Sequence, residues 1–499
     1  MSYVEELLRD AFGRWAGREA VVHGGGRLTY RELGGHVAVL AAALAHGTGT
    51  VGVLARNRPE ALVVHLACHL AGRPVAHVAR DASRPVQRTF LRDASATELC
   101  HDPNEARAAR SLAAEVPGLT PRPLALAPPP PGVDPPAAPP PAPASRVRTL
   151  LCTGGTTGVP KGVVHTHALF APPALEPVAL ATPGERCLVF TDLSHVSWYF
   201  AMPTLRAGGT LVLHEGFDAG AFLRLVPGER VTRVLLSPPQ LAKVLDHPEC
   251  AGADLSSLRL LAYGAAPSAP HRLQQAAERF GPVLQQVYGL TEAGVVSVLT
   301  PEDHLHGDAA VRASVGRPAP GVSIEVRDAE GAPLPAGESG EVWMRGPALM
   351  AGYLGPEHAN EPALHGGWLR TGDLGRLGGD GCLTLEGRCK ELLIHHATGT
   401  HVYPRLIEEA LLGHPAVREA AVWAVPDERH GGDHVHAAVT LTEDAPGAHA
   451  LRAHVATVLH QDHMVPEHVE VRTDMPLTRA GKIDKSALAG RRERGSEGR

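Results

Sequence analysis

The sequence predicts an α/β protein with a large N-terminal domain and a small C-terminal domain, and three observations support this prediction. Through about residue 320, short apolar segments alternate with segments of helical periodicity, which is typical of mixed or largely parallel sheets flanked by helices. From about Val322, short strands and turns favour a small barrel-like subdomain or a meander. After Arg388 a second α+β pattern begins, and its roughly 110 residues suffice for an independent domain. We therefore expect domains at residues 1–388 and 389–499.

In the N-terminal part, apolar residues at helical spacing predict a helix at Tyr30–Ala45. Val51–Ala55 follows as a buried strand, because the run is apolar and ends at the polar segment Arg56–Pro59. Other expected strands are Arg148–Cys152, Cys187–Phe190, Thr210–Leu213 and Thr232–Leu236, and the expected helices after them are Pro239–Leu245 and Ala269–Phe280.

The C-terminal part begins with two short strands and continues with the α+β pattern. The strands of the subdomain are expected at Ser323–Val326 and Gly340–Met344. In the small domain, helices are expected at Pro404–Leu412 and Leu451–Leu459, and strands at Ala420–Val425 and His434–Leu441.

Residues 117–145 are dominated by proline and alanine. Proline lacks the backbone donor that a sheet interior needs, and such runs prefer extended polyproline conformations. We expect a solvent-exposed connector within the large domain, with an SH3-type ligand as the alternative.

The charge balance excludes several classes of partner. The chain has 47 basic and 53 acidic residues, a formal net charge of −6, which argues against a general surface for nucleic acid or anionic lipid. The apolar run Val37–Ala45 is too short to span a bilayer, and no basic segment followed by an apolar one opens the chain. We expect a cytoplasmic protein without nucleic-acid or membrane partners.

Cysteines and histidines give no sign of a metal site in the sequence. The seven cysteines are scattered without a C-x-x-C pair, which indicates reduced thiols. His165 with His167, and His395 with His396 and His401, are close in sequence. Neither group has nearby cysteine or carboxylate partners, so we expect neither to bind metal.

The segment Leu150–Gly162, LLCTGGTTGVPKG, has the composition of a phosphate-binding loop. Glycines allow backbone N–H groups to converge on an anion, threonine hydroxyls add donors, and Lys161 adds charge. It differs from a Walker A loop, because Pro160 precedes the lysine and Gly162 follows it. A flexible turn is the alternative interpretation.

Five further motifs follow in order: YGAAP at 263–267, YGLTEAG at 288–294, WLRTGD at 368–373, GRCKE at 387–391 and PLTRAGKIDK at 476–485. Together the six segments resemble the adenylate-forming superfamily of acyl-CoA synthetases, peptide-synthetase adenylation domains and luciferases, from about Tyr30 to Leu488. The resemblance implies that the first loop closes over the β- and γ-phosphates of ATP, through Thr153, Gly154, Gly155, Thr156, Thr157, Gly158 and Lys161.

The second and third motifs carry the groups expected around the nucleotide. The resemblance implies that Tyr288 stacks on the purine, that Thr291 holds a phosphate oxygen, and that Glu292 binds Mg²⁺, which suits an aromatic ring, a hydroxyl and a carboxylate. Gly289 lies within this motif. Gly264, Ala265 and Ala266 would lie beside adenine, although core packing explains these small residues equally well.

The last motifs imply ribose contacts and a mobile domain. Asp373 is suited to the ribose hydroxyls, since a carboxylate accepts two hydrogen bonds, and Arg388 is the second ribose contact that the resemblance implies. Lys390 matches the hinge about which the small domain rotates. The resemblance of the last motif implies that Lys482 is the catalytic cation, which suits the chemistry, because a carboxylate that attacks a phosphate needs a positive charge between the two anions. The loop 391–403 is two residues longer than the resemblance implies, which leaves the acyl acceptor open.

The acid-binding segment is expected at FTDLSHVS, residues 190–197. By resemblance, His195 is the gate of the pocket, and Val196 replaces the aspartate that binds the α-amino group in amino-acid-activating domains. Asp192 replaces that aspartate only if the alignment is shifted. The other expected pocket residues are small or apolar: Ser197, Phe200, Ala262, Gly264, Val287, Val295 and Val296. An aryl, cinnamate-like or short to medium aliphatic acid fits best.

These inferences predict a ligase that uses ATP and Mg²⁺ to adenylate a carboxylic acid and then transfers the acyl group to CoA. Thr291, His195 and Lys482 are its expected catalytic residues. The alternatives are transfer to a carrier-protein thiol or to a non-thiol nucleophile, or a catalytically silent nucleotide-binding module. A monomer or homodimer is expected.

Overall fold

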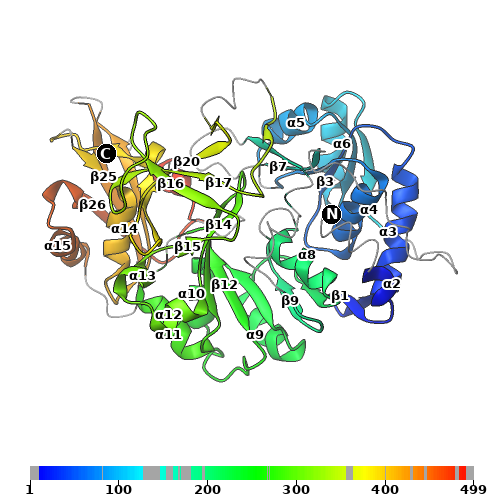
Figure 1. The fold of residues 1–499 in the computed structure, drawn as a ribbon, viewed down its shortest axis with the longest axis horizontal. Helices are drawn as coiled ribbons and strands as arrows, with labels where there is room; N and C mark the ends of the chain where they lie inside the picture. The colour runs from blue at the N-terminus through cyan, green and yellow to red at the C-terminus, as the bar shows by residue number, and fades with distance from the viewer. Residues whose placement is uncertain are drawn as a thin grey trace, which may run out of the picture.

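The structure is a computed structural model. It describes residues 11–80, 82–126, 147–152, 161–166, 169, 181–193, 197–266, 268, 270–355, 363–398, 400–427, 431–442, 447–477 and 483–490. The chain forms two large sheets with their helices, an antiparallel subdomain and a small α+β unit at its C-terminal end (Figure 1).

The first sheet has seven strands in the order β18-β8-β7-β4-β3-β5-β6. They are β3 Thr50–Leu54, β4 Val75–His77, β5 Ala96–His101, β6 Thr120–Pro123, β7 Val147–Cys152, β8 Gly162–Thr166 and β18 Gly352–Tyr353. The strands β7, β4, β3, β5 and β6 are mutually parallel, whereas β8 and β18 are antiparallel additions at the β7 edge. The helices α4 Pro59–Ala71, α5 Arg84–Asp93 and α6 Ala106–Glu115 alternate with these strands.

The second sheet has nine strands in the order β15-β14-β13-β12-β11-β9-β10-β1-β2. They are β1 Glu19–His23, β2 Gly26–Thr29, β9 Arg186–Val189, β10 Thr210–Leu213, β11 Arg233–Leu236, β12 Leu260–Gly264, β13 Leu284–Leu290, β14 Gly294–Leu299 and β15 Arg317–Pro318. Its helices are α2 Phe12–Arg14, α3 Tyr30–Leu44, α8 Trp198–Arg206, α9 Ala219–Gly228, α10 Pro238–Leu245, α11 Pro270–Phe280, α12 Pro301–His306 and α13 Ala309–Ala313.

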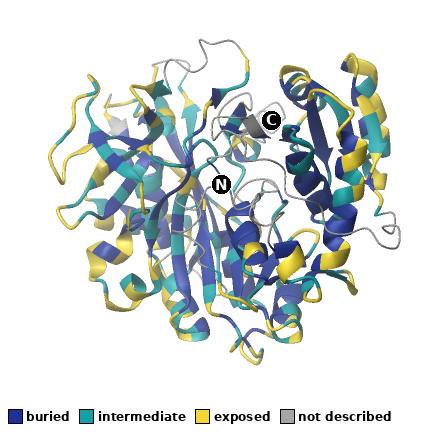
Figure 2. Cartoon of the chain, turned by 45° about the vertical axis from the view of Figure 1, so that its right-hand side comes forward, coloured by how far each residue is buried: buried dark blue, intermediate teal, exposed yellow. Residues whose placement is uncertain are grey.

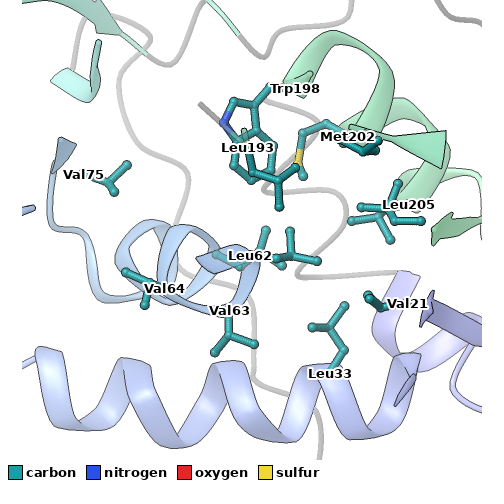
Figure 3. Close-up of a cluster of buried hydrophobic side chains, with 14 of the residues drawn as sticks. Val21, Leu33, Leu62, Val63, Val64, Val75, Leu193, Trp198, Met202 and Leu205 are labelled. Atoms are coloured by element: carbon teal, nitrogen blue, oxygen red, sulfur yellow. The ribbon is translucent and has the colours of Figure 1, made fainter. Parts of the chain in front are cut away.

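A shared apolar core joins the two sheets. Figure 3 shows Leu62 and Val63 of α4 facing Leu33 of α3, with Trp198 and Met202 of α8 beside them. The helix α3 begins at a full capping box, in which Thr29 and Glu32 satisfy each other's backbone donors. Figure 2 shows that the strands are buried and that exposed residues gather on the outer faces of helices and on turns. This core packs the two large sheets against each other, and several of the predicted nucleotide-binding residues lie on and beside strands of these sheets.

The antiparallel subdomain contains β16 Ser323–Arg327, β17 Ser339–Arg345, β19 Leu364–His365, β20 Trp368–Leu377 and β21 Leu383–Arg388. Its described pairings run β16-β17-β20-β19, with β21 beside β20, and every pair is antiparallel. Among the described strands these pairings make an antiparallel sheet, as both the barrel-like and the meander expectation require.

The small domain contains the 3₁₀ turn η5 Cys389–Glu391, the hairpin β22 Leu393–Ile394 and β23 His401–Val402, and a sheet of β24 Val417–Pro426, β25 Asp433–Leu441 and β26 His468–Arg472. The helices α14 Pro404–Leu412, α15 Ala448–Leu459 and α16 Lys485–Gly490 and the turn η6 Asp462–Met464 complete it. Among the described residues, its main core runs from Leu393 to Val469 and takes no residue from the large domain. This separation supports the boundary that we propose at Arg388.

The Pro-rich segment differs from the expectation at its beginning. Thr120–Pro123 forms β6, which pairs in parallel with β5 and is therefore part of a sheet and not a connector. The strand lies at the edge of the sheet, where proline is tolerated because no second neighbour needs its missing donor. Residues 127–146 lie outside the described part of the chain.

Within the described residues, no helix combines the length and apolar character needed to cross a membrane.

Candidate active site

Asp373 is held between an arginine and a tyrosine from two other strands. It lies on β20 directly opposite Arg388 of β21, and Arg388 Nε is 3.0 Å from Asp373 Oδ1. Tyr288 of β13 donates its hydroxyl hydrogen to Asp373 Oδ2 at 2.6 Å. The structure therefore brings together three residues that the sequence assigned to the base and the ribose.

The protonation of this trio follows from burial and charge. Burial raises the pKa of Tyr288 well above its usual value, and the adjacent Asp373 carboxylate raises it further. The charge of Asp373 is also the main cause that raises the pKa of Arg388. Tyr288 is thus a hydrogen-bond donor and Arg388 a cation, and both fix the orientation of one carboxylate.

Glu292 is linked to Lys161 through a tyrosine that the sequence analysis missed. Tyr353 of β18 donates its hydroxyl hydrogen to Glu292 Oε1 at 2.8 Å. Lys161 Nζ lies 4.5 Å from the centroid of the Tyr353 ring, within the range of a cation–π interaction. The pairing of β18 with β8 brings these groups together. The lysine of the predicted phosphate loop and the predicted magnesium ligand therefore belong to one cluster.

Thr291 is positioned through its backbone. His165 of β8 donates from Nε2 to the Thr291 carbonyl oxygen at 2.6 Å, since a carbonyl can only accept. The same contact gives His165 a structural role. Met350 donates its backbone N–H to the Glu292 carbonyl at 2.7 Å, so the whole turn after β13 is tied to its neighbours.

Several predicted residues lie outside the described part of the chain. They are Thr153, Gly154, Gly155, Thr156, Thr157 and Gly158 of the phosphate loop, His195 and Val196 of the acid-binding segment, and Lys482. In sequence, the phosphate loop connects β7 to β8, and Lys482 directly precedes Ile483.

The small residues of the second and third motifs have packing roles. A Cβ at Gly264 would collide with the backbone oxygen of Val287, and one at Gly289 would collide with the backbone oxygen of Gly294. Ala265 has φ of 72°, a left-handed conformation that is strained for alanine, and it is exposed, whereas Ala266 is partly exposed. Close strand packing therefore accounts for Gly264 and Gly289, whereas Ala265 and Ala266 lie in a turn after β12.

The expected acid pocket is assembled in part. Phe200, Ala262, Val287 and Val295 are buried in the same apolar cluster, whereas Val296 packs in a different cluster with Val163. Successive side chains of a strand point to opposite faces, so Val295 and Val296 of β14 cannot face one pocket together. The structure thus separates Val296 from the others.

Two polar residues of the acid-binding segment are engaged within the protein. The Ser197 hydroxyl donates to the Asp192 carbonyl at 2.9 Å and lies 2.5 Å from Thr191 Oγ1. Asp192 Oδ2 is 3.9 Å from Arg80 Nη1, which gives this carboxylate a cationic partner. Ser197 and Phe200 also line a small hollow with Leu235.

A partly buried ion pair joins the proposed hinge to the segment after Lys482. Lys485 Nζ lies 2.8 Å from Glu408 Oε1 of α14 and 3.0 Å from Glu391 Oε2 of η5. Burial alone would lower the pKa of Lys485, but the two carboxylates hold it above its usual value. The PLTRAGKIDK motif contains Lys485, yet only the fold places both partners beside it.

Two family models match the chain. The model of the AMP-binding enzymes matches residues 8–354, and that of the AMP-binding enzyme C-terminal domain matches residues 406–482.

Similar proteins cover nearly the whole chain. A medium/long-chain fatty-acid–CoA ligase from Mycobacterium tuberculosis is 33% identical, across 97% of this chain and 89% of the relative. A feruloyl-CoA synthase from an Amycolatopsis species is 35% identical, across 94% of this chain and 95% of the relative. The structure of an amide bond synthetase from Marinactinospora thermotolerans superposes with a TM-score of 0.85 at 34% identity, covering 97% of this chain and 99% of that one.

Proposed function

The chain belongs to the AMP-binding enzyme family, and from this membership we propose that it joins a carboxylic acid to the thiol of CoA in two steps. In the first step a carboxylate oxygen of the acid attacks the α-phosphorus of ATP, which forms an acyl adenylate and releases pyrophosphate. In the second step the thiol attacks the acyl carbon, which forms the thioester and releases AMP. We propose a cytoplasmic monomer or homodimer.

The single observation that carries this proposal is the carboxylate of Asp373, which Tyr288 and Arg388 hold between them. Asp373 is 5% exposed, so its orientation is set by these two partners and not by solvent. Each carboxylate oxygen has more than one lone pair, and those left over can accept hydrogen bonds from ribose hydroxyls. Arg388 and Tyr288 would bind the sugar and the base beside it.

The donor set around Glu292 fits Mg²⁺. Tyr353 occupies one lone pair of Glu292 Oε1 and orients the carboxylate. The other lone pairs of the two carboxylate oxygens can then bind a cation. Mg²⁺ in phosphate sites commonly takes one or two carboxylates and completes its shell with phosphates and water. Glu292 would hold the ion, which would neutralise phosphate charge, and Lys161, over the ring of Tyr353, would add a second positive charge.

Lys482 supplies the cation for the first step in this proposal. Lys485, three positions later, is anchored to the hinge turn by Glu391 and to α14 by Glu408. The lysine-bearing segment would therefore move with the small domain when that domain rotates about Lys390.

The acid is expected to have an uncharged aryl, cinnamate-like or aliphatic group. Phe200, Ala262, Val287 and Val295 present an apolar surface, which favours such groups over a zwitterion. The relatives named for feruloyl and fatty acyl groups are consistent with this class.

A second candidate function is transfer of the acyl group to an amine. The amide bond synthetase of Marinactinospora supports this alternative, because it matches over nearly the full length of both chains. In this case the same adenylate would form, and only the nucleophile of the second step would differ.

The test is acid-dependent pyrophosphate release from ATP, measured over aryl and alkyl acids with CoA, with an amine or with neither. Thioester in the CoA arm supports the main proposal, whereas amide in the amine arm alone supports the second candidate. Lys482→Ala should bind ATP but release pyrophosphate far more slowly. ATP binding without acid-dependent release in the unmodified enzyme would indicate a silent nucleotide-binding module.

A further inference from the structure

A cluster of two imidazoles and two carboxylates lies in the small domain, among residues with no role in the proposed reaction. His396 lies in the β22–β23 hairpin, Asp427 follows β24, His434 is on β25, and Glu467 precedes β26. The antiparallel pairing of β24 with β25 and the parallel pairing of β25 with β26 bring Asp427, His434 and Glu467 to one end of the sheet. His396 joins them because its backbone N–H donates to the Asp433 carbonyl at 3.1 Å.

The two histidines lie side by side, and each faces both carboxylates. Their ring centroids are 4.0 Å apart. His434 Nδ1 is 2.7 Å from Glu467 Oε2, and His396 Nε2 is 3.2 Å from Glu467 Oε1. On the other side, Asp427 Oδ2 is 3.6 Å from His396 Nδ1 and 3.6 Å from His434 Nε2. The contacts with Glu467 have hydrogen-bond length, and the contacts with Asp427 do not.

The position of the proton on each imidazole ring determines which of its nitrogens can bind a metal. A neutral imidazole has one N–H, so it can donate to one carboxylate only and turns a lone pair toward the other. His434 Nδ1 forms a hydrogen bond with Glu467, and a neutral His434 that donates it turns the lone pair of Nε2 toward Asp427 Oδ2. His396 Nε2 also lies beside Glu467, and in the tautomer protonated there the lone pair of Nδ1 faces the same Asp427 oxygen. A cation between these three atoms would bind a lone pair of each.

From this arrangement we propose that His396 Nδ1, His434 Nε2 and Asp427 Oδ2 bind one divalent transition metal of the zinc class. One ligand atom from each of the three residues lies within 4.8 Å of the others. Zinc bonds of about 2.0–2.2 Å in a tetrahedron place neighbouring ligand atoms about 3.3–3.6 Å apart. The two nitrogen–oxygen separations of 3.6 Å agree with that spacing. Imidazole ligands favour zinc, nickel or copper over Mg²⁺ and Ca²⁺.

Glu467 completes the arrangement as an outer partner. A metal-bound histidine commonly donates its second N–H to a carboxylate, which fixes the tautomer and the ring orientation. Glu467 lies at the correct nitrogen of both rings to accept these two hydrogen bonds. His395, the neighbour of His396, has its Nδ1 3.1 Å from Thr398 Oγ1.

Metal binding at this site would join the hairpin to the sheet. The hairpin follows the proposed hinge turn, and a hydrogen bond from Ile394 N to Asp433 Oδ2, of 3.1 Å, also ties it to β25. A metal would add His396 as a further link to β25 and to the end of β24. Hydrogen exchange of residues 393–402 should therefore slow when zinc is added.

The experiment compares zinc binding by the full chain, without an affinity tag and after chelator treatment, with that of two variants. The first is the double variant His396→Ala, His434→Ala. The second, His449→Ala, removes an exposed histidine of α15 outside the cluster and controls for adventitious binding among the 29 histidines. Calorimetric titration should give one more bound zinc in the wild type and in His449→Ala than in the double variant. Equal stoichiometry in all three proteins would overturn the proposal.

A conservative variant keeps the test valid if the double variant does not fold. Glu467→Gln preserves size and leaves the three ligands in place. The affinity for zinc should fall by about 10–100-fold with the stoichiometry unchanged, since the outer carboxylate orients both rings. Cobalt bound to the wild type should give the intense visible absorption of a tetrahedral site. Unchanged zinc affinity in Glu467→Gln, or the weak absorption of octahedral cobalt in the wild type, would contradict the assignment.

Discussion

The hydroxyl of Tyr288 donates to Oδ2 of Asp373 at 2.6 Å, although 85 residues separate the two in the chain. Tyr288 lies on β13 of the nine-stranded sheet, and Asp373 lies on β20 of the antiparallel subdomain. This hydrogen bond therefore joins the two units at the place where we propose that the nucleotide binds. Arg388 engages the other oxygen of the same carboxylate. The geometry of the ribose site therefore depends on contacts between units and not on the TGD triplet alone.

Replacing Asp373 by asparagine should weaken ATP binding by about tenfold or more. An asparagine side chain is neutral and has one accepting oxygen, so it would lose the ion pair with Arg388 and would keep a hydrogen bond to Tyr288 only where the phenolic oxygen accepts from its amide. Loss of a hydrogen bond to a charged group costs about 1.5–3 kcal/mol. The KM for ATP in acid-dependent pyrophosphate release measures the change. Tyr288→Phe keeps the ring and removes one hydrogen bond, so it should raise the KM less, and an unchanged KM in Asp373→Asn would exclude the ribose role.

Loss of the Tyr353 hydroxyl should raise the Mg²⁺ concentration that the enzyme needs. Tyr353 orients Glu292, and outer-shell partners of metal ligands typically contribute 10–100-fold to affinity or activity. We expect a rise of that order in the Mg²⁺ midpoint for Tyr353→Phe and a larger rise for Glu292→Gln, which removes the proposed ligand, measured by Mg²⁺ titration of pyrophosphate release. Identical midpoints in the wild type and Glu292→Gln would remove Glu292 from the metal site.

Much of the fold could be predicted from local patterns. The helix Pro404–Leu412 begins at a proline and ends before Gly413, and the structure has the same bounds. The strand Thr210–Leu213 is also found as predicted, because four apolar or β-branched residues follow two glycines. The strand β6 was not predicted, since proline-rich composition does not distinguish a strand at the edge of a sheet from a connector.

Residues of the candidate site could be predicted only where they belong to a recognisable sequence motif. Tyr353 lies on a strand of two residues, and no local pattern links it to Glu292, which is 61 residues away in the chain. The expectation that His396 lacks carboxylate partners was wrong for the same reason. Asp427 and Glu467 reach it only through strand pairing, so sequence distance gave no information about this cluster.

Replacing Lys485 by methionine should destabilise the small domain. Glu408 is 5% exposed and would keep only the backbone N–H of Val422 as a partner for its carboxylate. Removing one member of a buried ion pair typically costs about 3–5 kcal/mol. Chemical denaturation should show this loss, and the double variant Lys485→Met, Glu408→Gln should recover part of it, since the uncompensated charge is then gone. Full stability of Lys485→Met would show that the pair does not anchor the segment.

Acid should destabilise the large domain through His304 of α12. Burial lowers the pKa of His304 to about 4, against the opposing effect of Asp303, and its Nε2 lies 3.3 Å from the Tyr263 hydroxyl. The unfolded chain takes up the proton near pH 6.5, whereas the folded protein does not until about pH 4. The contribution of His304 to the free energy of unfolding is therefore complete above about pH 6.5. It is lost as the pH falls from about 6.5 to about 4.

The slope in this window is at most about 1.4 kcal/mol per pH unit for one group. The pKa of the buried His65 is also lowered by burial, and its contribution has the same sign, so the test is a difference between variants. His304→Gln should reduce the pH dependence of the free energy of unfolding between about pH 6.5 and 4. His306→Gln, an exposed position on the same helix, should leave it unchanged. Equal slopes for the two variants would mean that His304 is protonated in the folded protein as readily as in the unfolded chain, and that its burial has no influence on acid stability.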